Sequence, residues 1–148
     1  MPNNDVVTAL GTHFDAELVG GKNRQAVVLT SSTSGGMTPN HFVIANTNNA
    51  RTVKASPGQL YYLVISNNYG YGFWVKVYDK ASNPNPASDV PKGAFWVPAG
   101  LPLPLAFEGG LEFTLGIAML VVKGSADTDN TAMTSTGSEG GTVFSGYK

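Results

Sequence analysis

Hydrophobic and polar positions alternate over short stretches of this chain, and turn-forming residues interrupt the alternation often. With 18 Gly and 9 Pro among 148 residues, no amphipathic stretch of helical length remains between the breaks. Alternating β-branched and aromatic side chains bounded by turn residues are typical of β-strands. Nine segments are predicted as strands: residues 26–31, 41–46, 51–55, 59–66, 73–80, 94–98, 104–107, 117–123 and 142–147. The pattern predicts an all-β protein with a single domain, a sandwich or a barrel. Of these two, we expect a β-sandwich of the jelly-roll-like kind.

The first 25 residues follow a different pattern from the rest of the chain. Their apolar residues are scattered without a sustained period, and the pair Gly20–Gly21 separates them from the first predicted strand. A short helix around residues 13–18 is one interpretation, and a free terminus is another. The apolar side chains of Phe14 and Leu18 favour an arm that docks. We therefore expect an N-terminal arm at residues 1–25 and a β-sandwich domain at residues 26–148.

The predicted strand at residues 59–66 is apolar on both sides. One face carries Leu60, Tyr62 and Val64, and the other carries Tyr61, Leu63 and Ile65. Because side chains alternate across a strand, a strand of a free sandwich should present one polar face to water. Two hypotheses explain the second apolar face: a loop or the arm packs over it, or a partner subunit covers it. The second hypothesis makes Tyr61, Leu63 and Ile65 candidate interface residues.

Composition and charge narrow the class of protein. Hydrophobic residues make up 42% of the chain, as in globular proteins, but charged residues make up only 13% and the net charge is −1. So little charge leaves two hypotheses: Ser, Thr, Asn and Gly cover the surface, or other protein covers it. Both suit an assembled particle better than a free monomer. The chain has no basic run that would attract nucleic acid. It has no Cys, no apolar stretch long enough to span a membrane, and no secretory signal at its start, which predicts synthesis in a cytoplasm.

The segment GSADTDNTA places several oxygen ligands close together. Asp127, Asp129 and Asn130 could belong to a calcium loop, a catalytic pair or a solvated turn. A calcium loop of the EF-hand type needs a third oxygen ligand followed by glycine, but Thr131 takes the third position and alanine follows. Nothing in this Gly- and Ser-rich context desolvates a catalytic carboxylate. The three residues are therefore interpreted as a structural turn without a metal, since Asp and Asn side chains often bond nearby backbone amides.

No other pattern in the chain predicts catalysis. His13 and His41 lack the spacing of metal ligands, and neither a nucleophile elbow nor a phosphate-binding loop occurs. The segment at residues 30–40 is rich in Ser and Gly, but it does not join a strand to a helix. We expect no catalytic residues and no cofactor, and hence a protein that is not an enzyme.

An aromatic cluster, NNYGYGFW, lies between two predicted strands. Its Tyr69 and Tyr71 could stack on a sugar, contact another protein, or fold back over the edge of the sheet. Together with Trp74 and Trp96, these tyrosines are the candidate residues for binding a glycan. All four are candidate interface residues as well.

Residues 58–148 resemble a family of small proteins encoded among the virion genes of tailed bacteriophages and prophages. The resemblance is carried by the segments KVYDKA, PAG, FEGGLEFTLGIA and GSADTDNTA and by the terminal GYK. Members are described as uncharacterised, head decoration, cement or minor structural proteins. The first 57 residues have no counterpart in this resemblance. The chain departs from the family pattern in its Tyr-rich turn and in the segment TSTGSEGG.

The resemblance implies a β-sandwich that assembles on a phage particle, often as a homotrimer, and it carries over no catalytic residues. The expected function is that of a viral structural protein, a capsid decoration or cement protein that binds the major capsid protein and stabilises the assembled bacteriophage head. Its expected location is the virion, after synthesis in the bacterial host cytoplasm. The alternative is a module of a phage fibre or spike that binds a glycan or receptor on the host surface.

Overall fold

The computed structural model describes residues 6–7, 13–14, 16–19, 22–25, 36–137 and 139–148. The chain divides into two units, Met1–Ser34 and Gly35–Lys148, which are described separately. In the first unit, β1 (Val6–Val7) pairs antiparallel with β2 (His13–Phe14), and β3 (Ala16–Val19) pairs antiparallel with β4 (Lys22–Gln25). The helix considered around residues 13–18 is therefore wrong, because strand residues occupy this stretch. The strand predicted at residues 26–31 lies outside the described residues.

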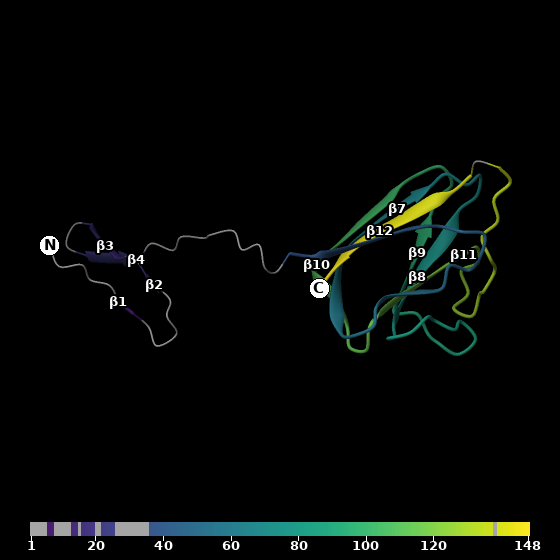
Figure 1. The fold of residues 1–148 in the computed structure, drawn as a ribbon. Coiled ribbons are helices and arrows are strands. Elements are labelled where there is room, and N and C mark those ends of the chain that lie inside the picture. Colours follow the sequence, from purple (N-terminus) through teal and green to yellow (C-terminus); the bar gives the residue numbers. More distant parts are fainter. Residues whose placement is uncertain (1–5, 8–12, 15, 20–21, 26–35, 138) are drawn as a thin grey trace. The chain divides into compact units, whose positions relative to one another are not determined.

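The second unit is all-β, as the alternating sequence pattern predicts (Figure 1). Its strands are β5 (Thr38–Val43), β6 (Arg51–Lys54), β7 (Gly58–Asn67), β8 (Phe73–Asp79), β9 (Gly93–Val97), β10 (Leu103–Phe113), β11 (Ile117–Val122) and β12 (Gly141–Tyr147). Each overlaps one of the predicted strands. The largest difference is β10, which is much longer than the predicted segment at residues 104–107.

The strands form two antiparallel four-stranded sheets with the orders β10-β7-β12-β5 and β6-β11-β8-β9. The pairs β5·β12, β6·β11, β7·β10 and β8·β9 are nested, with the first strand of the unit beside the last and the two middle strands beside each other. This nesting is what results when one long antiparallel hairpin is rolled into two facing sheets. The β-sandwich therefore has the strand order of a jelly roll, as expected from the sequence.

The core lies between the two sheets and consists of inward side chains from both. Phe73, Val75 and Val77 of β8 alternate with outward residues, and all three are fully buried. The whole of β11 is buried, although only every second residue can face the opposite sheet. Its outward residues form a second cluster with Tyr78, so other parts of the chain must cover the outer face of the β6-β11-β8-β9 sheet.

The two-sided apolarity of β7 comes partly from a bulge. Tyr147 of β12 lies opposite Leu60 and Gly146 lies opposite Tyr62, so β7 has one extra residue at this point. The bulge interrupts the alternation of side chains along β7. As a result, the side chains of Leu60 and Leu63, which are three positions apart, both point into the core. Leu63 and Ile65 are fully buried against the opposite sheet. They are unavailable to a partner in the folded unit, which corrects the hypothesis that a partner covers them.

A second irregularity shapes β10. Its register against β7 shifts between Ala106 and Leu111, and the intervening Gly109 and Gly110 have φ angles of 78° and 84°. Glycine adopts such positive φ angles without the penalty that a side chain imposes. The two glycines thus break the regular strand, and beyond them Phe113 returns to the core.

Candidate interaction surface

The outer face of the β10-β7-β12-β5 sheet, called the outer face below, presents a row of side chains that crosses all four strands. The register places His41 of β5 beside Phe144 of β12, Phe144 beside Val64 of β7, and Val64 beside Pro104 of β10. Val64 is 42% exposed and Phe144 is 38% exposed. Apolar side chains are therefore in contact with water at the centre of this sheet and not only at its edges.

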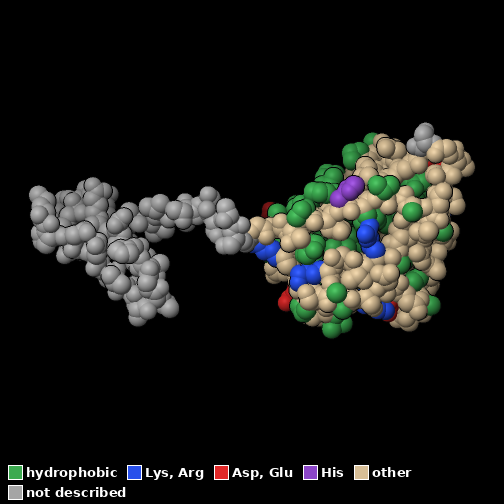
Figure 2. Space-filling view, viewed as in Figure 1, with side chains coloured by type: hydrophobic (Ala, Val, Ile, Leu, Met, Phe, Trp, Pro, Cys, Tyr) green, Lys and Arg blue, Asp and Glu red, His purple; other side chains and the backbone are tan. Residues whose placement is uncertain are grey.

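Aromatic rings pack against one another on the outer face. The Phe144 ring centroid lies 5.7 Å from that of Tyr62 and 6.4 Å from that of His41. Tyr62 has room because Gly146 stands beside it, where a Cβ atom would lie only 2.1 Å from the tyrosine ring. Figure 2 shows hydrophobic side chains gathered around a histidine over this part of the second unit. The rings are tilted to one another by 32° and 50°, and together they form an aromatic platform on the sheet.

The middle of the outer face carries no acid, lysine or arginine. Around the row that crosses the four strands, the outward residues are Pro39, His41, Val43, Tyr62, Val64, Ser66, Pro104, Ala106, Thr142 and Phe144. The acids Glu108 and Glu112 lie further along β10, where Glu112 pairs with Gln59. Apolar and aromatic residues without charge are characteristic of the buried centre of a protein interface. This face can therefore bury area against another protein without desolvating ions.

The opposite outer face, on the β6-β11-β8-β9 sheet, is covered by the chain itself. Lys76 and Tyr78 point outward from β8, and both are buried. The Lys76 ammonium donates a hydrogen bond to the carbonyl oxygen of Ala126, in the segment after β11. Burial lowers the pKa of Lys76. The two outer faces therefore differ among the described residues: loops cover this one, whereas Val64 and Phe144 leave the other partly exposed.

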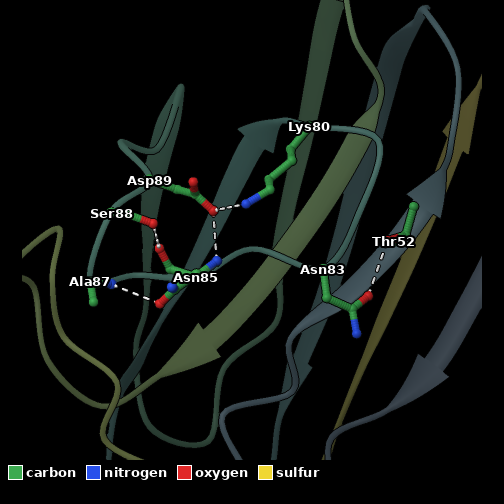
Figure 3. Close-up of polar contacts among 7 residues, drawn as sticks. All are labelled: Thr52, Lys80, Asn83, Asn85, Ala87, Ser88 and Asp89. Atoms are coloured by element: carbon green, nitrogen blue, oxygen red, sulfur yellow. Dashed lines mark hydrogen bonds and ion pairs between the residues drawn. The ribbon is translucent and has the colours of Figure 1, made fainter.

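Polar contacts hold the loop between β8 and β9 in one shape (Figure 3). The Asp89 carboxylate accepts hydrogen bonds from the Lys80 ammonium at 2.5 Å and from the Asn85 amide at 2.6 Å. Asn83 accepts a hydrogen bond from the Thr52 hydroxyl at 3.0 Å, which ties the loop to β6. The hydrogen bond from Lys80 is the main cause that lowers the pKa of Asp89. The loop is therefore a fixed part of the sandwich.

Asp129 organises the turn that follows β11. Its carboxylate accepts hydrogen bonds from the Gly124 amide at 3.1 Å, the Thr131 amide at 3.0 Å and the Thr131 hydroxyl at 3.0 Å. Burial alone would raise the pKa of Asp129. The hydrogen bonds and the nearby Lys76 lower the pKa by more than burial raises it, so the net shift is downward. The carboxylate thus ties both ends of the turn together and leaves little of its bonding capacity for a metal.

The other two residues of the predicted turn have different surroundings. Asp127 is exposed, and Asn130 accepts a hydrogen bond from the Asn48 side chain at 2.5 Å. Among the described residues, no three His, Asp or Glu side chains cluster closely enough to hold a metal ion. The geometry brings Asp129 and Asn130 into a structural turn, while Asp127 remains outside its hydrogen bonds.

The two candidate tyrosines of the aromatic turn fold into the sandwich. Tyr69 is buried, and its hydroxyl donates a hydrogen bond to the Ile44 carbonyl at 3.3 Å. The Tyr71 hydroxyl donates to the Thr134 carbonyl at 2.6 Å and accepts from the Thr134 amide at 3.0 Å. Both hydroxyls are therefore engaged within the chain. This arrangement matches the alternative in which the rings fold back, and it removes Tyr69 from a glycan surface.

The remaining candidate aromatic residues lie elsewhere on the unit. Trp74 and Trp96 pair across β8 and β9 with their ring centroids 5.4 Å apart, and Trp96 is 46% exposed. Tyr61 is half-buried, and its hydroxyl donates to the Gln59 side chain at 2.6 Å. Neither tryptophan belongs to the outer face, since both lie on the other sheet, and Tyr61 lies at the bulge beside the row rather than in it. The candidate residues named from the sequence therefore do not form one site.

Sequence reasoning missed the residues that form the outer face. It placed Tyr62 and Val64 on one side of β7 but chose the opposite side as the candidate interface. His41 and Phe144 were not considered for this role at all. The signal was present in the segments HFV and VFS, whose outward positions are apolar or aromatic where a free sandwich would carry charge.

Two hollows lie elsewhere on the second unit. One, of about 540 Å³, lies between the start of β7 and the end of β10, with Glu112 and Lys148 in its lining. The other, of about 300 Å³, lies beside Phe42, over whose ring the Arg51 guanidinium lies at 4.3 Å. Both are wide open to solvent, and neither gathers groups that would act together on a substrate.

Comparison with protein-family models, with curated proteins and with solved structures finds no match to this chain. Within the described residues, the structure has no helix long and apolar enough to cross a lipid bilayer.

Proposed function

We propose that this chain is a virion structural protein, a capsid decoration or cement subunit that binds the shell of a tailed bacteriophage head through its outer face. The observation that carries the proposal is the uncharged row His41–Phe144–Val64–Pro104, which crosses four strands and is not covered by the folded unit. Exposed apolar patches of this kind mark protein interaction sites. The partner is the major capsid protein, and the place of action is the capsid surface after synthesis in the bacterial cytoplasm.

The proposed mechanism is stabilisation by binding. A subunit that attaches only to the assembled shell favours assembly by mass action, and it needs no chemical step. The proposal is therefore a binding protein rather than an enzyme. Jelly rolls occur in viral capsid and lectin domains, and this analogy of fold supports the proposal without identifying the partner. We also propose that copies of this chain associate with one another. The family resemblance implies that they do so as a trimer.

The experiment compares phage particles that carry the protein with particles that lack it. We expect particles without it to lose infectivity at a lower temperature or after milder osmotic shock, while they adsorb to host cells normally. Because the contact buries almost no charge, its strength should change little with salt concentration. Equal heat and osmotic survival of the two kinds of particle would contradict the proposal.

The second candidate function is a glycan-binding module of a fibre or spike. It is favoured by the exposed Trp96 ring, which stacks with Trp74, since aromatic rings of this kind bind sugars. Under this alternative, particles without the protein survive heat but adsorb poorly, and free glycan competes with adsorption. Replacing Trp96 with Ala would then reduce adsorption, whereas a shell-binding protein would keep its effect on heat survival.

A further inference from the structure

The four edge strands of the sandwich are not protected equally. An exposed strand edge offers free amide and carbonyl groups to another chain, and proteins block such edges with proline, charge, short strands or bulges. Strand β5 contains Pro39, and the short β6 contains Arg51 and Lys54. Strand β10 contains Pro104 and the bulge at Gly109. Strand β9, the edge of the β6-β11-β8-β9 sheet, is also short, with five residues, but it contains no proline, no charged residue and no bulge.

The surroundings of β9 are unusually apolar for a free edge. Residues 93–107 include no charged side chain, and this stretch is bounded by Lys92 and Glu108. The Phe95 ring points toward the core, with its centroid 5.9 Å from that of Phe107 on β10, yet both rings are only partly buried. The margin of the sandwich between β9 and β10 is thus incompletely closed by the unit itself.

We propose that β9 pairs along its free edge with β9 of a second copy of this chain, antiparallel and centred on Phe95. This register is self-complementary in size: it sets Ala94 opposite Trp96 of the other copy, and Gly93 opposite Val97 of the other copy. At these two pairs a large side chain meets a small one, and at the centre the two Phe95 side chains lie opposite each other. Because the strand carries no charge, the twofold arrangement creates no like-charge contact.

The pairing has two structural consequences. It extends the β6-β11-β8-β9 sheet continuously into the second copy and covers the half-buried Phe95. It is also isologous, since the same edge serves both copies, and so it predicts an even number of copies where the family resemblance implies a trimer. It leaves the outer face free, so the contact between copies and the proposed contact with the shell are separate.

The experiment uses engineered cysteines in a chain that has no Cys of its own. One preparation carries Ala94→Cys and another carries Trp96→Cys. A disulfide requires Cβ atoms about 3.5–4.5 Å apart. Directly opposed residues of the proposed register lie about 4.5–5.5 Å apart, close enough to reach this distance with a small shift of the strands. The diagonal pairs formed by two copies of the same variant are about 7–8 Å apart. We expect an equimolar mixture under mild oxidation to form cross-linked dimers at least 10-fold faster than either variant alone.

The matched control pairs Trp96→Cys with Thr52→Cys on β6, the other edge of the same sheet, and should not cross-link. Sedimentation of the native protein should show a dimer, and Ala94→Glu should shift it to a monomer with an unchanged circular dichroism spectrum. A mixture that cross-links no faster than the single variants, or a native protein that sediments as a monomer or trimer, would overturn the proposal. Binding of the Ala94→Glu variant to phage shells is scored separately, so that loss of the dimer and loss of shell binding are distinguished.

Discussion

Tyr62 and Phe144 come from strands far apart in the sequence, yet their rings lie 5.7 Å apart on the outer face. Phe144 is held in turn between His41 and Val64 by the strand register. An aromatic platform fixed by backbone pairing loses little conformational entropy when a partner covers it. This relationship turns an exposed sheet into a surface prepared for binding.

The platform depends on the absence of a side chain at Gly146. In Gly146→Ala the new Cβ would lie 2.1 Å from the Tyr62 ring, which must then swing away from Phe144. Because the ring lies on the solvent side, we expect a loss of stability below about 1 kcal/mol but a changed near-ultraviolet circular dichroism spectrum. The control is Gly140→Ala, where a Cβ meets no atom within 4 Å. An unchanged spectrum for Gly146→Ala would contradict the packing described for Tyr62.

Asp79 fixes the connection from β10 to β11. Burial raises its pKa, but hydrogen bonds from the Leu115, Thr114 and Gly116 amides and from the Thr114 hydroxyl lower it from 3.8 to about 2. We expect Asp79→Ala to reduce the free energy of unfolding at pH 7 by about 2 kcal/mol.

The same residue predicts a dependence on pH. Because the folded-state pKa of Asp79 lies below the unfolded value, its stabilisation is present above about pH 4 and is lost as the pH falls toward about 2. In urea unfolding, the difference in the free energy of unfolding between the native protein and Asp79→Ala should therefore become smaller over this pH range. The exposed Asp127, replaced by Ala, is the control. A gap that stays constant down to pH 2 would show that the carboxylate charge contributes nothing.

Tyr78 is buried under the loops that cover β8, and its hydroxyl has no hydrogen-bond partner among the described residues. Tyr78→Phe should therefore keep or slightly raise the stability at pH 7, by up to about 1 kcal/mol. Burial, followed by the nearby Asp127 and Asp89, raises the pKa of Tyr78 from 10.0 to about 12. The folded state accommodates the neutral hydroxyl but not the phenolate. The pH-dependent contribution of Tyr78 to the free energy of unfolding is therefore fully present below pH 10 and is lost as the pH rises through 12. Thermal melts should show that Tyr78→Phe weakens this alkaline loss, and an identical loss in both proteins would contradict the assignment.

The turn after β11 predicts unequal roles for its two aspartates. Asp129→Ala removes three hydrogen bonds and should lower the free energy of unfolding by about 1–2 kcal/mol, whereas Asp127→Ala should change it by less than about 0.5 kcal/mol. Thermal unfolding with and without a chelator should give the same melting temperature. A fall of several degrees with the chelator, restored by calcium, would reinstate the metal-loop hypothesis.

The sequence predicted the strands of the sandwich well because their alternation and their turn residues are local signals. The break at Gly109 was also predictable, since consecutive glycines in a strand favour a bulge. The bulge at Tyr61 was not, because it depends on the register between β7 and β12. Local alternation could not show that Leu60 and Leu63 point to the same side, and so the wrong side of β7 was taken as the exposed one.

The candidate surface was harder to predict than the fold. The aromatic cluster around Tyr69 and Tyr71 draws attention in the sequence, but its hydroxyls are bonded within the unit. The outer face is built from residues on strands separated by most of the chain, such as His41 and Phe144. Only the nested strand order brings them together, and a single sequence without the pairing does not specify it.

The most direct measurement of the central claim is co-sedimentation of the purified protein with phage shells that lack it. The test variants are Val64→Glu and Phe144→Glu, which place a charge at the centre of the outer face. The control is Val90→Glu, at a site that is 77% exposed in the loop between β8 and β9. All three variants should keep the native circular dichroism spectrum. We predict at least 10-fold weaker shell binding for the two outer-face variants and native binding for Val90→Glu; native binding by all three variants would contradict the account.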